Sequence, residues 1–255
     1  MNILVCIKQI PDVGGKIKLS DDGRDIDSRN LGSTISPHEE CAVEEAIQLV
    51  KKEGGSATVL TLGIADSENQ LRESLARGMN KGVLLHTENS NWNASQIAHA
   101  ITDTIKKMET DNGSFDLILF GGESADRGNA QVGVLVAHAL DRPSVNGING
   151  LEITGNIALV KRDSDEGTEN YELDLPAVLS VKDGMNLPRF PSLKGTVMAK
   201  KKPIQFIEVE PDDTGIGFLK FEHTPEQSKQ AVILGRGPEA AANVVQVLKK
   251  LELVR

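Results

Sequence analysis

The chain has 255 residues, of which 39% are hydrophobic and 25% charged, a composition that excludes a disordered protein. Its net charge of −9 argues against nucleic acid as its partner. No apolar run approaches the ~18 residues that cross a bilayer, and no signal pattern opens the chain, so we expect a cytoplasmic protein without membrane insertion. Cys6 and Cys41, the two cysteines, fit neither a zinc site nor a disulfide framework, which favours a reducing compartment.

Strands and helices are predicted to alternate as far as Leu140. Near-continuous apolar runs predict strands over 2–10, 56–63, 82–86 and 115–122. Helical periodicity and capping residues predict helices over 37–53, 66–78, 93–109 and 129–140. This alternation indicates an α/β fold with a doubly wound, mainly parallel sheet of the Rossmann-like kind. Such sheets bind ligands at the carboxyl ends of their strands.

The pattern changes after Pro143. Two short strands are expected within 150–163 about a Gly-Asn turn, and a further strand pair within 169–181, interrupted by Pro176. A last strand is predicted over 202–210 and a final helix over 238–251. We therefore expect an α/β nucleotide-binding domain over 1–210, with an added β segment, and a C-terminal arm and helix over 211–255 that packs on a partner.

The run "FGGESADRGNAQVG" over 120–133 is the strongest candidate for binding. Gly121 and Gly122 would let the backbone approach a ligand closely, and amides near 128–130, at the expected helix start, would hold phosphate. Asn129 and Gln131 add side-chain donors. The alternative is an ordinary strand–helix turn with polar filler, since the run is neither a Walker loop nor a G-x-G-x-x-G motif.

Other candidates follow neighbouring strands of the predicted sheet. Lys8, in an otherwise buried run, points either into the strand-end crevice or to solvent. Ser36 and His38, at a helix start, either touch a ligand there or only form a helix cap. Leu62 ends the second strand, where an adenine ring can lie. These residues favour an adenine-nucleotide-binding protein, and they include no recognisable catalytic acid, base, nucleophile or metal set.

The run "PRFPSLKGTVMAKKK" over 188–202 predicts a stiffened, exposed loop. Two prolines bracket Phe190, Leu193 follows, and three lysines close the run. The alternative is that Phe190 and Leu193 fold back onto the core. Lys194 and the lysines at 200–202 would either steer an acidic partner or only solubilise the next strand.

Four segments together resemble the β subunit of the electron transfer flavoprotein family, along essentially the whole chain. They are "ILVCIKQIPD", "CAVEEAIQL", "LVKRDSDEGTENYELDLPAVLSV" and "NLPRFPSLKGTVMAKKKPI". The third is close to the family signature and departs from it at Tyr171, where a branched aliphatic residue is usual. We interpret that departure as a local change of packing.

The resemblance implies an αβ heterodimer that carries electrons and is not itself an enzyme. Its FAD would lie mostly on the α subunit, and the β subunit would hold a structural AMP. The implied AMP contacts are Cys6, Ser36, Pro37, His38, Glu39, Leu62, Gly121, Gly122, Glu123, Ser124, Ala125, Asp126, Arg127, Gly128, Asn129, Ala130, Gln131 and Val132. Val13 and His38 match positions near the flavin, and Asp163 matches an acidic position that helps to set the resting place of the flavin domain.

The resemblance also implies docking partners. Leu193, next to Phe190, matches the anchor that enters a pocket on flavin dehydrogenases such as acyl-CoA dehydrogenases, in fatty acid oxidation. A membrane quinone oxidoreductase would accept the electrons. One branch of the family holds a second FAD in place of AMP; its loop resembles D-G-D-T-A-Q-V-G-P, and residues 126–134 share only part of that run. Alternatives from other classes are a stand-alone sensor of the universal-stress type and an ATP-pyrophosphatase.

Overall fold

The computed structural model describes the chain except residues 13–17, 28, 89–91, 214–219, 223–230 and 255. It forms two compact units, Met1–Lys220 and Phe221–Arg255. The position expected near the flavin at Val13 lies outside the described residues.

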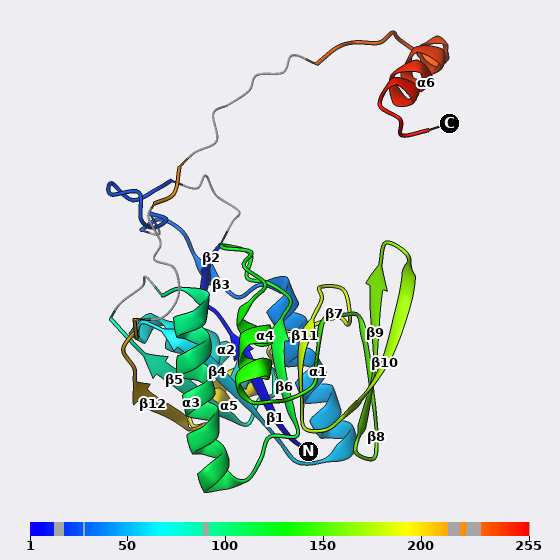
Figure 1. The fold of residues 1–255 in the computed structure, drawn as a ribbon. Helices are drawn as coiled ribbons and strands as arrows, with labels where there is room; N and C mark the ends of the chain where they lie inside the picture. Colours follow the sequence, from blue (N-terminus) through cyan, green and yellow to red (C-terminus); the bar gives the residue numbers. More distant parts are fainter. Residues whose placement is uncertain (13–17, 28, 89–91, 214–219, 223–230, 255) are drawn as a thin grey trace. The chain divides into compact units, whose positions relative to one another are not determined.

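The first unit is built on a seven-stranded sheet in the order β12-β5-β4-β1-β6-β11-β7, and each pair of neighbouring strands in it is parallel (Figure 1). Its strands are β1 (Asn2–Ile7), β4 (Ser56–Gly63), β5 (Lys81–His86), β6 (Leu117–Gly121), β7 (Ser144–Ile148), β11 (Ala177–Val181) and β12 (Ile204–Glu208). The predicted α/β class and mainly parallel sheet are therefore confirmed.

Helices cover both faces of this sheet, as the side chains of β1 show. Ile3, Val5 and Ile7 belong to one buried cluster with α1 (Pro37–Glu53) and α2 (Glu68–Arg77). Leu4 and Cys6 belong to a second cluster with α3 (Ala94–Asn112) and α4 (Val132–Ala139). Because successive strand residues point to opposite faces, a strand buried on both faces reads as one continuous apolar run.

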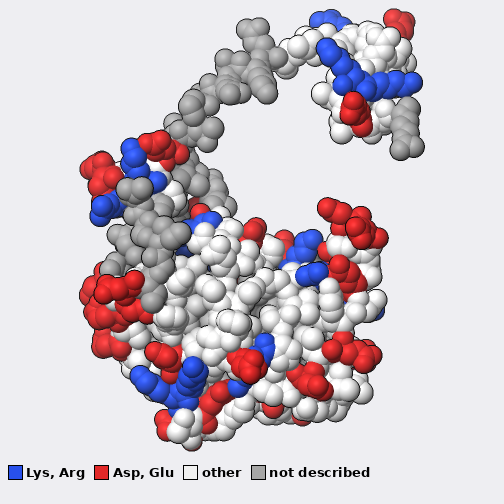
Figure 2. All heavy atoms as spheres, in the orientation of Figure 1, with Lys and Arg blue, Asp and Glu red and all other residues white. Residues whose placement is uncertain are grey.

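A separate antiparallel sheet is formed by β8 (Gly150–Thr154), β9 (Ile157–Ser164) and β10 (Gly167–Asp174). The predicted turn at 155–156 joins β8 to β9. Figure 2 shows acidic side chains at the tip of the β9–β10 hairpin, where the sequence has Asp163, Asp165 and Glu166. The expected pairing within 169–181 is wrong, because β10 belongs to this sheet and β11 to the main one.

Three other boundaries differ from the prediction. The first strand ends at Ile7, and Ile10 pairs instead with Thr34 in a small antiparallel ribbon of β2 (Ile10–Pro11) and β3 (Ser33–Thr34). Helix α4 begins at Val132, because the preceding loop takes the left-handed conformation that a right-handed helix excludes. The segment predicted as a loop over 188–202 contains a helix, α5 (Leu193–Ala199).

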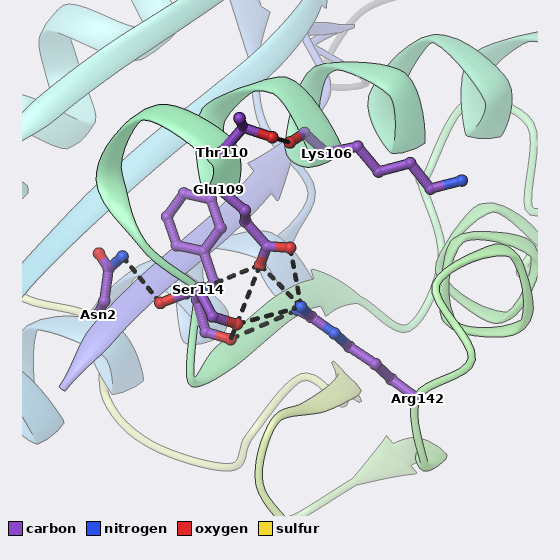
Figure 3. A network of polar contacts seen from close by, with 7 residues as sticks. Asn2, Lys106, Glu109, Thr110, Ser114 and Arg142 are labelled. Atoms are coloured by element: carbon purple, nitrogen blue, oxygen red, sulfur yellow. Dashed lines mark hydrogen bonds and ion pairs between the residues drawn. The ribbon is translucent and has the colours of Figure 1, made fainter.

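A polar network ties α3 to the loop after α4 (Figure 3). The guanidinium of Arg142 donates to both carboxylate oxygens of Glu109, at 2.8 and 2.9 Å, and to the hydroxyl of Ser114 at 3.3 Å. Glu109 also accepts the backbone N–H of Phe115 at 2.9 Å. Bidentate pairs of this kind fix geometry as well as charge, so the network sets the position of the chain that leads into β6.

The second unit contains the short helix η2 (Pro238–Ala240) and α6 (Ala241–Lys250). Several of its apolar side chains are exposed, namely Val232, Ile233, Val244, Val245, Val247, Leu251, Leu253 and Val254. In the part of the chain that the structure describes, no helix combines the length and apolar character that crossing a membrane requires.

Candidate functional site

A cavity of about 280 Å³ opens where the central strands of the main sheet end. The ends of β1, β4 and β6 and the loops that follow them supply most of its lining, because parallel strands bring their carboxyl ends to one edge. The predicted residues that line it are Cys6, Glu39, Leu62, Gly121, Gly122, Glu123, Ser124, Asp126, Arg127, Asn129, Ala130, Gln131 and Val132. Ser36, Pro37, His38, Ala125 and Gly128 are not among its lining residues.

The lining divides into apolar and polar parts. Apolar side chains come from Leu62 and Ile64 after β4, from Trp92, Ile97 and Ile101 in and before α3, and from Phe120. Polar side chains come from the end of β1 and from the loop between β6 and α4, as Lys8, Gln9, Ser124, Asp126, Arg127, Asn129 and Gln131. A cavity with both kinds of wall suits a ligand that has a flat apolar part and a polar or charged part.

The β6–α4 loop has an unusual backbone. Gly128 and Ala130 both have positive φ values, 58° and 50°. Glycine adopts this conformation freely, but for Ala130 it is strained by about 1–3 kcal/mol. Strain of this kind collects at binding sites, and in this loop it turns the chain along the cavity before α4 begins.

Gly121 and Gly122 line the cavity and also allow close packing of neighbouring elements. A Cβ at Gly121 would lie 2.7 Å from Cγ of Glu39 and 3.2 Å from Cβ of His38. At Gly122 it would lie 3.3 Å from the carbonyl oxygen of Val181. The space that side chains would take is thus filled by protein, so these glycines allow the start of α1 and the end of β11 to approach β6.

Glu39 joins three parts of the site although it is almost fully buried. Its carboxylate accepts the backbone N–H groups of Lys8 and Ser36, each at 3.0 Å. Burial raises the pKa of Glu39 to about 8, although these hydrogen bonds and the charge of Lys8 act in the opposite direction. Burial and then the nearby Glu39 carboxyl raise the pKa of the Cys6 thiol, so that the thiol stays protonated.

Lys8 points into the crevice, which decides between its two predicted orientations. Its ammonium group forms an ion pair with Oδ2 of Asp126 across the cavity wall. The other carboxylate oxygen of Asp126 is buried and has no hydrogen-bond partner among the described residues. Since buried polar atoms are normally paired, this oxygen is an exception among the buried polar atoms of the site.

Ser36 and His38 lie beside the cavity and brace its loops. The Ser36 hydroxyl donates to the carbonyl oxygen of Glu123 at 3.0 Å. Nδ1 of His38 accepts the backbone N–H of Asp183 at 2.9 Å, and its Nε2 is 4.0 Å from a carboxylate oxygen of Glu123. Both side chains therefore hold the start of α1 against the loops that follow β6 and β11.

Asp163 lies outside the cavity, near the tip of β9–β10. Its carboxylate accepts hydrogen bonds from Asn149 and, at 3.1 Å, from the Thr168 hydroxyl. Arg162 on the same strand pairs with Glu169 and lies over the ring of Tyr171, 5.5 Å from its centroid. The departure at Tyr171 is thus accompanied by a local polar and cation–π cluster.

The sequence did not point to several lining residues, such as Ser67. Its hydroxyl donates to Gln9 at 2.6 Å, in the candidate stretch at the end of the first strand, and both Gln9 and Ser67 line the cavity. Trp92 and Ser180 also line it. Each of these residues ends a strand or precedes a helix on the same sheet edge, which is the signal that would have identified them.

The segment over 186–202 presents apolar side chains away from the core. Phe190 is 93% exposed and Leu193 is 90% exposed, so neither folds back. Lys202 does not face solvent as expected, because its ammonium group donates to the carbonyl oxygens of Leu75 and Met79 at the end of α2. Within the described ranges, no cluster of three or more His, Cys, Asp or Glu residues is placed to hold a metal ion.

Comparison with known proteins identifies a family. The electron transfer flavoprotein domain matches residues 25–212. The chain is 36% identical to "Electron transfer flavoprotein subunit beta" of Bacillus subtilis (strain 168), over 98% of both chains. It is 36% identical to the protein of the same name in Syntrophomonas wolfei, over 89% of this chain and 88% of the relative. It is 32% identical to "Acryloyl-CoA reductase electron transfer subunit gamma" of Anaerotignum propionicum, over 82% and 78%.

Proposed function

The chain belongs to the electron transfer flavoprotein family as a β subunit, and on this premise we propose that it binds AMP in the cavity described above. A β subunit of this family acts as an electron carrier with an α-subunit partner. The finer proposal concerns which nucleotide it holds, which donor it docks and which acceptor it serves.

The cavity fits an adenine nucleotide in three respects. Leu62, Ile64 and Trp92 supply apolar surface for a flat base. Lys8 and Arg127 supply positive charge for a phosphate, as do the backbone amides of the loop before α4. The side-chain amides of Asn129 and Gln131, which line the cavity, can hydrogen-bond a ribose hydroxyl or a base. The combination of apolar and cationic side chains around one cavity at the strand ends is the observation that carries the proposal.

The alternative ligand at this site is a second FAD. The run Ala130–Gly133 agrees with the branch that holds it, whereas Arg127 and Val134 do not. Extraction of the purified heterodimer with acid, followed by chromatography of the released nucleotides, distinguishes the two. We expect one FAD and one AMP per heterodimer. Two FAD and no AMP would replace the proposal with its alternative.

In the proposed mechanism the β subunit binds, braces and docks. FAD held mainly by the α subunit supplies the redox chemistry when it is bound. Residues of this chain hold the nucleotide and keep the strand-end loops in place around it, with Glu39 joining the end of β1 to the start of α1. We propose that Asp163, at the acidic hairpin tip, helps to set the resting position of the flavin domain, and that Val13 and His38 lie near the flavin.

The segment over 186–202 is proposed to dock flavin dehydrogenases such as acyl-CoA dehydrogenases. One desolvated apolar side chain can dominate a small interface, and Leu193 is available for that role because it is 90% exposed. Electrons would then pass through FAD toward a membrane quinone oxidoreductase. Leu193→Ala should raise the KM for the heterodimer in reduction by butyryl-CoA dehydrogenase and leave nucleotide content unchanged. An unchanged KM would contradict the proposal that Leu193 contacts the dehydrogenase.

The second unit is proposed to pack on the α subunit. Its α6 exposes Val244, Val245 and Val247, which a stand-alone sensor would be expected to bury. Co-purification tests this: the full chain should retain a flavin-containing partner, and deletion of residues 231–255 should weaken that retention. A stable monomer that binds adenine nucleotide without a partner would favour the sensor instead.

A further inference from the structure

The segment over 186–202 carries an unusual set of exposed apolar side chains. Leu187 is 89% exposed, Phe190 93%, Leu193 90%, Val197 63% and Met198 52%. Apolar side chains on a free loop would collapse onto the nearest apolar surface. Their exposure in this structure therefore requires that the backbone beneath them be held from both ends.

Helix α1 holds the first part of this segment. The side chain of Asn186 donates to the backbone carbonyl of Cys41 at 3.1 Å and to the carboxylate of Glu45 at 3.0 Å. The guanidinium of Arg189 donates to both oxygens of Glu44, each at 2.8 Å, and the Arg189 backbone N–H donates to Glu44 at 3.2 Å. One carboxylate thus fixes both the backbone and the side chain of Arg189.

These two carboxylates are buried beneath the segment. Glu44 is 4% exposed and Glu45 is 8% exposed, so neither can touch a docking protein. Burial opposes ionisation of Glu44, but hydrogen bonds from Arg189 and Gln48 outweigh it and hold the pKa of Glu44 below its ordinary value. Glu44 is therefore ionised and committed to Arg189.

Helix α2 holds the second part through reciprocal capping. Arg72 of α2 donates to the carbonyl oxygens of Ala199 and Lys202, each at 2.8 Å, at the end of α5. Lys202 in turn donates to the carbonyl oxygens of Leu75 and Met79, at 2.9 and 2.6 Å, at the end of α2. Each helix end thus receives a cationic donor from the other element, which satisfies carbonyls that a helix leaves unpaired.

Gly195 lets α5 lie directly against α2 (Figure 1). A Cβ at Gly195 would be 2.3 Å from the backbone carbonyl oxygen of Ala76. Since backbone cannot move aside as a side-chain tip can, any larger residue would push α5 away from α2. Leu193 begins the same helix and would move with it.

We propose that α1 and α2 hold the 186–202 segment in the shape in which it docks, and that Glu44 and Gly195 are positioning residues for donor binding. The proposal rests on the docking role proposed above for this segment. A segment held in its binding shape loses less conformational freedom on docking, so affinity rises without any added contact. Glu44 and Gly195 act through the position of Leu193 and not by touching the donor.

The kinetic test uses the heterodimer reduced by butyryl-CoA dehydrogenase with butyryl-CoA. Glu44→Gln should raise the KM for the heterodimer by about tenfold with kcat and FAD content unchanged. The loosened segment must then be ordered on docking, and the conformational entropy lost in that step weakens binding. Glu40→Gln is the matched control, since Glu40 also lies on α1 and pairs with an arginine, Arg77, and among the described residues it forms no hydrogen bond or ion pair with the segment. It should leave the KM unchanged.

Combining Glu44→Gln with Leu193→Ala shows whether Glu44 acts by positioning Leu193 or by a general loss of structure. In the Leu193→Ala background, Glu44→Gln should raise the KM less than twofold further, because the side chain that it positions is absent. Gly195→Ala should behave in the same way. If Leu193→Ala raises the KM but Glu44→Gln does not, Glu44 does not position the segment. If each substitution raises the KM by the same factor alone and in combination, the two residues act independently. Either result contradicts the positioning proposal and leaves the docking role of Leu193 in place.

A second measurement needs no donor. Trypsin should cut after Lys194 about tenfold faster in Glu44→Gln than in the unchanged protein, since cleavage follows local opening. The Glu40→Gln control should be cut at the original rate. Equal cleavage of all three proteins would overturn the proposal. If Glu44→Gln is cut faster but Leu193→Ala has a normal KM, then α1 holds the 186–202 segment as described, but the segment does not dock the donor and the proposal is wrong.

Discussion

Gly121→Ala tests how tightly the start of α1 packs on the end of β6. The new Cβ would lie 2.7 Å from Cγ of Glu39 and 3.1 Å from its backbone nitrogen. The Glu39 side chain cannot swing aside, because its carboxylate accepts two backbone N–H groups at 3.0 Å each. The contact can be relieved only by moving α1 or the end of β6.

The expected loss follows from two opposing effects. Overpacking costs about 1–3 kcal/mol. Replacing glycine by alanine restricts the unfolded chain, which offsets about 0.4–1 kcal/mol. The difference of the two midpoints predicts that the free energy of unfolding falls by about 1.3 kcal/mol, and Tm by about 2–4 °C for each kcal/mol. Urea unfolding of the full chain, followed by circular dichroism, measures the change.

Gly32→Ala is the matched control. Its Cβ would meet nothing nearer than Cβ of Asp12, at 3.6 Å, an ordinary contact. This variant should be as stable as the unchanged protein or gain up to about 1 kcal/mol. If Gly121→Ala unfolded at the same urea concentration as Gly32→Ala, the close packing of α1 on β6 would be refuted.

Three further predictions concern charge and burial. Arg142→Met should cost about 1–3 kcal/mol, because it leaves the partly buried carboxylate of Glu109 without its cationic partner (Figure 3); a urea midpoint close to the original would contradict this. The pKa of Glu39 is raised from 4.5 to about 8, so the folded state binds the extra proton, and stability should fall as pH rises from 4.5 to 8, by up to about 1.4 kcal/mol per unit. Glu39→Gln should remove that slope in urea titrations at several pH values. If the unchanged protein became more stable than Glu39→Gln as pH rises from 4.5 to 8, the raised pKa of Glu39 would be wrong. Because burial raises its pKa, the Cys6 thiol should resist a disulfide reagent until the protein unfolds, and rapid labelling of the folded chain would refute this.

Local sequence patterns predicted most strands of the main sheet and the helices α1 to α4, but not the strand β7 or the place of β11 in that sheet. The apolar run at the start of the chain predicts a strand buried on both faces, and Ile3 and Leu4 indeed belong to opposite clusters. Pro37 begins α1 as expected, after Ser36 at the cap. Such features depend on neighbours within a few residues, which is why composition and spacing reveal them.

The predicted residues line the cavity where strand ends converge, and they lie outside its lining where their contacts come from distant elements. Leu62 and Asp126 line the cavity because both follow central strands. His38 does not line it, although it is adjacent to Glu39, because its ring is held by Asp183 after another strand. No local pattern could show that contact.

The sequence by itself determined the α/β class, the sheet edge that carries the cavity and the exposed apolar segment near Leu193. Only the tertiary structure decided what Gly121 and Lys202 do. Gly121 lines the cavity and also leaves room for α1, while Lys202 looked like surface charge and instead caps α2. The physical reason is the same in both cases: periodicity and capping are local, whereas the atoms that occupy the space beside a residue belong to elements far away in the chain.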